Sequence, residues 1–367
     1  MRVAVLHDYL NQFGGAERVL QVILDVFPNA DLYTLLYDKK KTFGFFERNI
    51  KKTSFLDNAL VRRKHRAFIP FMPMAANFLR SRESYDLVIS STAGYGKGIA
   101  IRAPYHISYC HSPLRYAWEI DYLKDLPFAP WPLKEMIVKP IAKRLQVWDK
   151  RSSDCVNLFL ANSHFIARKI HSYYGRDAVV IYPPVDTRIF YPDLQTSPGD
   201  YYLMVGRMLY YKRFDLGIQA FNRLRLPLKI VGQGPETAKL KTLVTSPRIE
   251  FVPFVSDRDL RVLYSGAKAL IFPQIEDFGL VAAEAQACGL PVIAYRGGGA
   301  EEIVEERKTG IFFNEQRCSA VTEAVRLFET MPFDRAYIAA RATKFSRFEF
   351  EKQLRGVLRE TGFIYEA

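Results

Sequence analysis

Short apolar runs alternate along this chain with stretches whose apolar residues recur at helical spacing, and this alternation constrains the fold most strongly. The alternation is clearest in the second half, where each apolar run is followed by a glycine-containing loop and a helix-compatible stretch. The four runs there are 201–205, 228–231, 269–272 and 291–295. Serial units of this kind require a mostly parallel sheet with helices on both faces. We therefore predict an α/β fold with two doubly wound, Rossmann-like domains.

The 367 residues are enough for two such domains with sizeable cores. The segment 183–200 contains four prolines, which exclude a regular helix or a central strand because proline lacks the backbone donor that both require. We predict that it links a first domain at 1–182 to a second at 201–345. Two sheets joined in this way form a cleft at the carboxyl ends of their strands, where ligands of such folds bind.

Basic charge is concentrated in the first half of the chain. Residues 1–182 contain 27 Lys and Arg against 16 Asp and Glu, whereas residues 183–367 contain 25 against 23. Ten of the cations lie within 39–66, which has only two acidic residues and precedes an apolar stretch at 67–79. This combination suits an anionic membrane surface, and it suits equally a solvated basic face beside a core segment.

Several classes of protein are disfavoured. No apolar run reaches the roughly 18 residues of a membrane span, and the N-terminal apolar run is too short for a signal peptide. The four cysteines lack the spacing of zinc or redox motifs, and no aromatic RNA-binding motif or KH-type loop supports nucleic-acid binding. Asp257 and Asp259 spell a D-x-D string, but they are better explained as acidic residues at a helix start than as metal ligands. We expect a cytoplasmic protein without a metal.

The stretch 269–295 has the most informative pattern, because it reads as strand, loop, helix and strand. Asp277 is the expected N-cap of a helix over 278–288. Glu276 would then lie at the carboxyl end of the strand, and Glu284 about two turns inside the helix. Helix N-termini favour anions, so three backbone amides would hold a phosphate there: those of Phe278, Gly279 and Leu280.

At this junction the residues resemble the E-x7-E motif of the retaining glycosyltransferases of the GT-B fold, family 4, with Glu276 and Glu284 as the two glutamates. Upstream, the segment with Arg207 and Lys212 is similar to the family's G-R-x4-K segment, although Arg213 stands where a glycine is common. The resemblance implies that Arg207 and Lys212 bind the donor diphosphate, where cations stabilise the charge that develops on the leaving group.

The resemblance continues in the first half and at the end of the chain. Gly14 and Gly15 match the family's N-terminal glycine-rich loop, and 109–118 resembles the H-S-P-x-R-Y-x-W stretch of mannosyltransferase-like members that build bacterial surface polysaccharides, including lipopolysaccharide. His111 matches a histidine that contacts the donor sugar. By the same resemblance, 346–367 is expected to return to the first domain.

Two further glycine-rich segments, 231–235 and 296–301, look like family segments near the donor base and in the cleft wall. Tight turns between strands and helices explain them equally well.

The resemblance implies a retaining hexosyltransferase that moves a sugar, mannose from GDP-mannose in first place, to a lipid-linked or growing polysaccharide acceptor. Glu284 would bind the ribose, Glu276 and the helix amides the donor sugar, and His111 its reacting side, with no cofactor. The protein would lie peripherally on the inner face of the plasma membrane through 39–66. The alternatives are the same fold with a UDP- or dTDP-sugar, a sugar-nucleotide epimerase or hydrolase, and a non-catalytic basic protein that binds polyanions.

Overall fold

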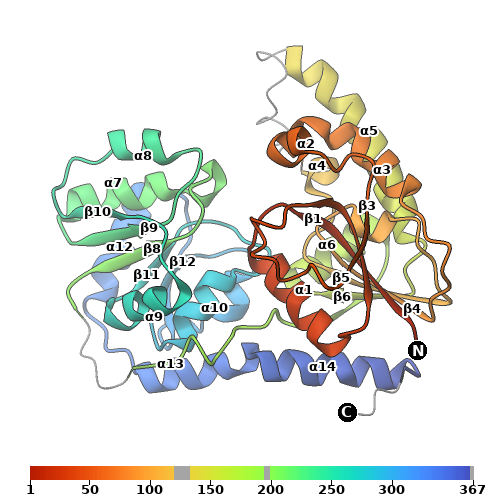
Figure 1. The fold of residues 1–367 in the computed structure, drawn as a ribbon. Coiled ribbons are helices and arrows are strands. Elements are labelled where there is room, and N and C mark those ends of the chain that lie inside the picture. Colours follow the sequence, from red (N-terminus) through yellow and green to blue (C-terminus); the bar gives the residue numbers. More distant parts are fainter. Residues whose placement is uncertain (120–132, 194–198, 364–367) are drawn as a thin grey trace. The chain divides into compact units, whose positions relative to one another are not determined.

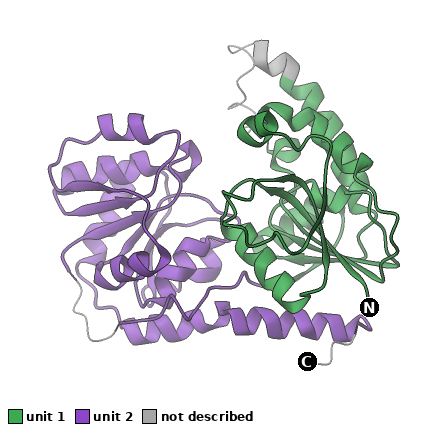
Figure 2. Ribbon diagram, in the orientation of Figure 1, with its two compact units in different colours: residues 1–181 green, residues 182–367 purple. Residues whose placement is uncertain are grey.

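The computed structural model describes residues 1–119, 133–193 and 199–363. The chain divides into two compact units, Met1–Ile181 and Tyr182–Ala367 (Figure 2). Each unit contains one parallel sheet with helices around it (Figure 1). The predicted α/β class with two Rossmann-like domains is confirmed.

Unit 1 is built on a seven-stranded sheet in the order β3-β2-β1-β4-β5-β6-β7, in which every neighbouring pair is parallel. The strands are β1 Val3–Leu10, β2 Asp31–Tyr37, β3 Ile50–Thr53, β4 Leu87–Thr92, β5 Tyr105–Cys110, β6 Leu158–Ala161 and β7 Ala178–Val180. The helices are α1 Gly15–Val26, α2 Ala59–Lys64, η1 His65–Phe71, α3 Met72–Phe78, η2 Gly96–Gly98, α4 Arg115–Trp118, α5 Leu133–Ser153 and α6 His164–Tyr174.

Unit 2 contains a six-stranded parallel sheet in the order β10-β9-β8-β11-β12-β13. Its strands are β8 Tyr202–Val205, β9 Leu228–Val231, β10 Ile249–Val252, β11 Leu270–Phe272, β12 Val292–Tyr295 and β13 Gly310–Phe313. Its helices are η4 Tyr210–Lys212, α7 Phe214–Leu224, α8 Thr237–Thr242, α9 Asp257–Gly266, α10 Leu280–Ala287, α11 Ala300–Ile303, α12 Cys318–Phe328, α13 Arg335–Ala342, η5 Thr343–Phe345 and α14 Arg347–Glu360.

The strands of unit 2 are apolar throughout because both of their faces are covered. In β11, Leu270 and Phe272 pack into the core beneath α10 and α13, whereas Ile271 packs into the core beneath α7 and α12. The four predicted strands of the second half are confirmed as β8, β9, β11 and β12; β9 has the predicted bounds, and the other three begin one residue later than predicted.

The beginning of the predicted linker packs against unit 2. Val185 and Phe190 are buried in its core, and Val185 forms an isolated bridge with Ser346 at the start of α14. The described residues 183–193 therefore form no regular helix or strand, yet they pack into the core.

Each sheet has one topological switch point. At this point the chain stops adding strands on one side of its first strand and begins to add them on the other side. This point lies between β1 and β4 in unit 1 and between β8 and β11 in unit 2. Loops diverge there at the carboxyl ends of the strands and leave a crevice, which is where open α/β sheets bind ligands. The loops after β8 and β11 are therefore the first place to seek a site in unit 2.

Candidate functional site

Lys212 and Glu276 form an ion pair across the switch point of unit 2. Lys212 ends η4 in the connection after β8, and Glu276 lies in the loop after the adjacent strand β11. Both side chains are largely but not fully buried, with 16% and 15% of their surfaces exposed. Two residues that the sequence assigned to one ligand are therefore in contact, and both remain accessible to solvent.

Arg207 lies exposed in the same connection after β8. The backbone around it is held against the loop after β9, because Gly206 N–H donates to Val231 O at 3.0 Å and Met208 N–H donates to Gln233 O at 3.1 Å. At Gly234, a Cβ atom would lie 2.2 Å from the Met208 carbonyl oxygen. The close approach of the two loops explains this glycine.

A cavity of about 630 Å³ opens beside these loops, at the carboxyl ends of β9 and β10. Its volume is in the range of small-molecule sites. It is lined by Gly232, Gln233, Gly234, Thr237, Lys241, Phe251, Val252 and Pro253.

Helix α10 begins later than the sequence indicated. Its N-cap is Gly279, with φ of +101°, so the prediction of Asp277 as N-cap is wrong. The chain enters the helix through a left-handed residue, which glycine adopts without steric cost, and a Cβ at Gly279 would also lie 3.0 Å from the Phe272 ring. Of the three predicted amides, those of Gly279, the N-cap, and Leu280, the first helical residue, are among the N–H groups that have no i→i−4 acceptor within the helix.

Glu284 lies about one turn inside α10 rather than two, because the helix begins two residues after the predicted start. Its side chain is buried, and its carbonyl oxygen accepts a hydrogen bond from Cys288 N–H at 3.2 Å. Burial, with a smaller contribution from the charge of Glu284, raises the pKa of the Cys288 thiol to about 12. Cys288 is therefore an inert core thiol.

The glycine-rich loop after β12 supports the backbone of Glu276. Gly299 N–H donates to Glu276 O at 2.9 Å, and Gly298 forms an isolated bridge with Glu276. A Cβ at Gly299 would lie 2.1 Å from the Phe278 carbonyl oxygen, so only glycine permits this contact. The loop fixes the position of Glu276.

Gln316, which sequence reasoning missed, joins the two loops that carry Lys212 and Glu276. Its Nε2 donates to Pro273 O at 2.8 Å, and its Oε1 accepts from the Arg213 guanidinium at 3.2 Å. Arg213 itself has φ of +52°, which explains why glycine is common at this position in the family that the sequence resembles. The sequence signal for this contact was an arginine, Arg213, at a position suited to glycine. Its partner Gln316 is 103 residues away, so the sequence did not identify it.

In unit 1, the predicted Gly14-Gly15 loop does open a helix, since α1 begins at Gly15. The Glu17 carboxylate accepts a hydrogen bond from Gly14 N–H at 2.8 Å and lies 3.9 Å from His7 Nε2. Glu17 and His7 are both buried, so the loop is tied to the interior of unit 1.

His111 follows β5, as the sequence indicated, and is nearly buried. Its Nε2 lies 2.9 Å from the Ser91 hydroxyl oxygen, its backbone N–H donates to Thr92 O, and its carbonyl oxygen accepts from Asn162 Nδ2. Contacts with β4 and with Asn162, which follows β6, therefore hold His111 at the carboxyl edge of the sheet.

Asp257 and Asp259 lie in the first turn of α9, where Ser256 is the N-cap and accepts from Asp259 N–H. Their expected role at a helix start is confirmed. Within the described residues, no group of three or more His, Cys, Asp or Glu side chains is arranged to hold a metal ion.

Two family models match the chain. The model described as Glycosyltransferase Family 4 matches residues 13–189, and the model described as Glycosyl transferases group 1 matches residues 193–345. Among curated proteins, a D-inositol 3-phosphate glycosyltransferase of Pseudarthrobacter chlorophenolicus is 32% identical over 199 residues, covering 47% of this chain and 47% of that protein. The protein of the same name from Mycobacterium tuberculosis (strain H37Ra) is 30% identical over 202 residues, covering 49% of this chain and 42% of that protein. The matches thus span about half the length of these relatives.

Solved structures share the fold over nearly the whole chain. Anabaena HepE in complex with UDP superposes with a TM-score of 0.69 at 18% identity, covering 98% of this chain and 100% of that one. Sucrose-phosphate synthase of Thermosynechococcus elongatus superposes with a TM-score of 0.71 at 17% identity, covering 98% and 99%.

Proposed function

Because this chain belongs to the glycosyltransferases of the GT-B fold, we propose that it transfers a sugar from a nucleotide-sugar donor to a glycan or lipid-linked glycan, with retention of the anomeric configuration. The observation that carries the proposal is the contact between Lys212 and Glu276 at the switch point of unit 2. A crevice of this kind with an accessible cation suits an anionic ligand.

Charge at the crevice supports a diphosphate as the anion. Lys212 pairs with Glu276, and Arg207 is exposed in the same connection. A bound diphosphate would compete with Glu276 for the Lys212 ammonium and leave the carboxylate to accept hydrogen bonds from the hydroxyls of the donor sugar. Negative charge grows on the diphosphate as the sugar departs, so these cations stabilise the transition state more than the bound donor.

The rest of the donor would occupy the surroundings of this pair. The 630 Å³ cavity beside the loop after β9 is large enough for a nucleobase. Glu284 would bind the ribose. The amide of Leu280 and the backbone of Phe278 and Gly279 would bind the donor sugar and phosphate. The Gly14-Gly15 loop would also contact the donor.

His111 is proposed for the reacting side of the donor sugar, with Ser91 fixing its ring. No side chain is assigned as a covalent nucleophile; the departing phosphate would take the proton of the acceptor hydroxyl.

GDP-mannose is the donor that we propose first, because 109–118 is similar to the mannosyltransferase-like segment. A UDP-sugar is the main rival, since the solved HepE structure contains UDP. Calorimetric titration with GDP-mannose, UDP-glucose and dTDP-glucose would rank the three bases. Failure of all three to bind would contradict the proposal, and sugar release or conversion without any acceptor would indicate a hydrolase or an epimerase instead.

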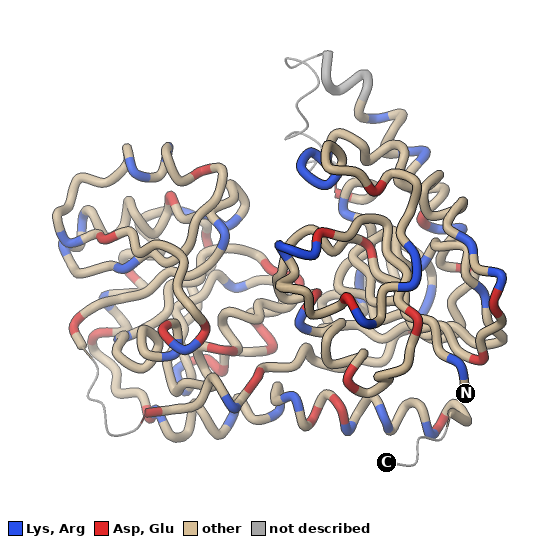
Figure 3. The backbone as a smooth tube through the Cα atoms, viewed as in Figure 1, with Lys and Arg blue, Asp and Glu red and all other residues tan. Residues whose placement is uncertain are grey.

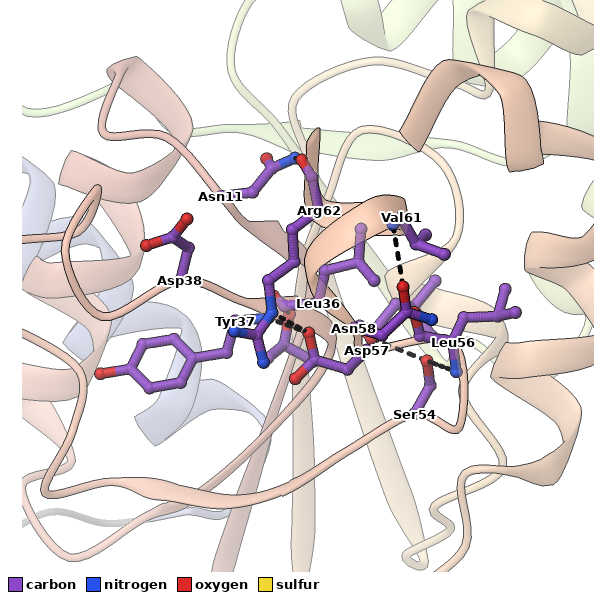
Figure 4. A network of polar contacts seen from close by, with 12 residues as sticks. Asn11, Leu36, Tyr37, Asp38, Ser54, Leu56, Asp57, Asn58, Val61 and Arg62 are labelled. Atoms are coloured by element: carbon purple, nitrogen blue, oxygen red, sulfur yellow. Dashed lines mark hydrogen bonds and ion pairs between the residues drawn. The ribbon is translucent and has the colours of Figure 1, made fainter. Parts of the chain in front are cut away.

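An anionic membrane surface is the proposed second partner, through the basic region 39–66. We propose a peripheral contact. Within the described residues, no helix combines the length and the apolar character that crossing a bilayer requires. Figure 3 shows the basic end of α2, where Arg63 and Lys64 are exposed. Figure 4 shows how this segment is anchored: Asp57 pairs with Arg62 at 2.6 Å, and the Asn58 side chain caps α2 by accepting from Val61 N–H.

Helix α3 adds an apolar surface to this basic end. It packs Met72, Ala75 and Ala76 into the core, whereas Phe71, just before it, and Met74 and Phe78 are exposed. The Phe78 ring lies 6.3 Å from that of Phe55, which is also exposed. Exposed aromatic residues beside cations suit the interface of an anionic bilayer.

Sedimentation with vesicles that contain 30% phosphatidylglycerol, compared with vesicles of phosphatidylcholine alone, would test the membrane contact. Binding to a polynucleotide in preference to both, without nucleotide-sugar binding, would favour the non-catalytic polyanion-binding alternative.

A further inference from the structure

The loop between β2 and β3 carries exposed aromatic side chains that neither the fold nor the proposed donor site uses. Residues 38–49 form this loop, and the rings of Phe43 and Phe45 lie 6.0 and 5.3 Å from the ring of Phe13. Phe46, 6.3 Å from Phe13, is fully buried and anchors the loop to unit 1. Phe43 and Phe45, in contrast, expose 69% and 54% of their surfaces.

The backbone of the loop is strained and held in place. Phe43 has φ of +53° and is followed by Gly44 at +73°. A bulky residue in the left-handed region is rare, and such residues gather at functional sites. The conformation is fixed by the loop's own hydrogen bonds: Thr42 N–H donates to Asp38 O at 3.1 Å, and Gly44 N–H donates to Lys39 O at 3.0 Å. The two exposed rings are therefore pre-organised.

The aromatic cluster lies at the carboxyl edge of the unit 1 sheet. Leu10 and Tyr37 are partners at the ends of β1 and β2, and Asp38 N–H donates to Leu10 O at 2.8 Å. Phe13 immediately precedes Gly14, so the cluster adjoins the loop that the proposed function assigns to the donor. The Arg18 guanidinium lies 5.8 Å from the centre of the Phe13 ring.

The chemistry around the rings indicates the class of ligand. Aromatic rings pack flat against the apolar faces of sugar rings, and exposed cations attract acidic groups on such sugars. Lys40, Lys41 and Arg48 are all exposed on the same loop. We propose that Phe13, Phe43 and Phe45 form an acceptor platform, on which a sugar ring of an anionic glycan stacks while its acidic groups face these cations. The inference rests on the proposed function, because it takes the glycan to be the acceptor of transfer.

The chain offers a matched control for testing this platform. Phe55 and Phe78 are a second exposed pair of contacting rings in unit 1, with 58% and 66% of their surfaces exposed. The probes are hexagalacturonic acid as an anionic oligosaccharide, maltohexaose as a neutral one of equal length, and vesicles containing 30% phosphatidylglycerol. Binding of each probe would be measured for the wild type, for the double variant F43A/F45A and for the control F55A/F78A.

We expect the wild type to bind hexagalacturonic acid more tightly than maltohexaose. F43A/F45A should weaken the binding of the acidic oligosaccharide about tenfold or more, on the scale of aromatic stacking in other ligand sites. F55A/F78A should leave this binding unchanged. Substituting Lys40 and Lys41 by Gln should weaken the binding of the acidic oligosaccharide and leave the binding of maltohexaose unchanged.

Absence of oligosaccharide binding by the wild type, or an equal loss in both double variants, would overturn the inference. Loss of vesicle binding in F43A/F45A without loss of oligosaccharide binding would also overturn it, in favour of a bilayer as the occupant. Calorimetry with the nucleotide panel separates this result from failure of the proposed function. Folded F43A/F45A should bind nucleotides as the wild type does. If the wild type binds no nucleotide, the proposed function fails, regardless of oligosaccharide binding.

Discussion

The two units share a doubly wound parallel sheet but use charged residues at and near its carboxyl edge in opposite ways. In unit 1, the buried Asp8 carboxylate accepts from the Thr92 hydroxyl and from the amides of Ala93 and Gly96. In unit 2, Lys212 and Glu276 pair with each other and remain partly exposed. A charged group at this edge can therefore either be satisfied by the protein's own donors, as Asp8 is, or belong to a pair that remains accessible to a charged ligand.

The interior of unit 1 continues this difference. Asp149 is fully buried and accepts from the Lys97 ammonium, from Trp118 Nε1 at 2.8 Å and from the Tyr174 hydroxyl at 2.7 Å. Burial, reinforced by the Asp149 charge, raises the pKa of Tyr174, so this hydroxyl remains a donor. Lys97 and Asp149 therefore connect η2 with α4, α5 and α6 as a rigid support.

The largest effect should come from breaking this support. Asp149→Ala leaves the buried Lys97 without its partner, and removal of one member of a buried ion pair costs about 3 to 5 kcal/mol of the free energy of unfolding. Urea denaturation would measure the loss, with the exposed Asp154→Ala as control. A loss equal to that of the control would show that the pair does not stabilise unit 1.

In unit 2, Lys212→Ala should instead leave the fold intact and lower turnover by about two to three orders of magnitude, the scale of one lost transition-state charge partner. Initial rates of sugar transfer would measure the effect. Lys268→Ala is the matched control, because Lys268 pairs with Glu329 beside the amino end of β11, at the opposite edge of the same sheet. A folded Lys212 variant with near-normal rates would contradict the assignment.

Acid should weaken unit 1 through His106, a buried residue of β5 in that unit. Burial, with a smaller contribution from Arg102, lowers the pKa of His106 to about 3. The unfolded chain takes up this proton below pH 6.5 and the folded chain does not, so the stability is complete above pH 6.5 and is lost as pH falls toward 3. Between pH 6.5 and pH 5 the loss should be about 2 kcal/mol.

Urea denaturation at pH 7 and pH 5 would test this loss of stability, with His106→Gln as the comparison. We expect the wild type to lose more stability between the two pH values than the variant does. Equal losses would show that His106 does not control the acid response.

The smallest effect should follow from separating the two loops of the unit 2 site. Gln316→Ala removes the hydrogen bonds to Pro273 and Arg213, and one such bond contributes about 1 kcal/mol, so turnover should fall severalfold while the donor KM changes little. Arg213→Gly removes the same bridge but relieves the left-handed backbone, so it should lower turnover without lowering the melting temperature. Reduced stability with unchanged kinetics would make the bridge purely structural.

Much of the fold could be predicted because its signals are local. Apolar periodicity identified β8, β9, β11 and β12, and their serial arrangement with helices implied parallel sheets. The start of α10 could not be placed in the same way, because Gly279 caps the helix through its left-handed backbone and not through a side chain that the sequence advertises.

The sequence by itself determined where strands end and glycine-rich loops begin, because apolar spacing and backbone preferences act between neighbours along the chain. Only the tertiary structure decided which of these loops meet. Lys212 and Glu276 are 64 residues apart and come together because β8 and β11 are adjacent in the sheet. The exposure of Phe43 and Phe45 beside Phe13 was decided in the same way, since it depends on β1 and β2 ending at one edge.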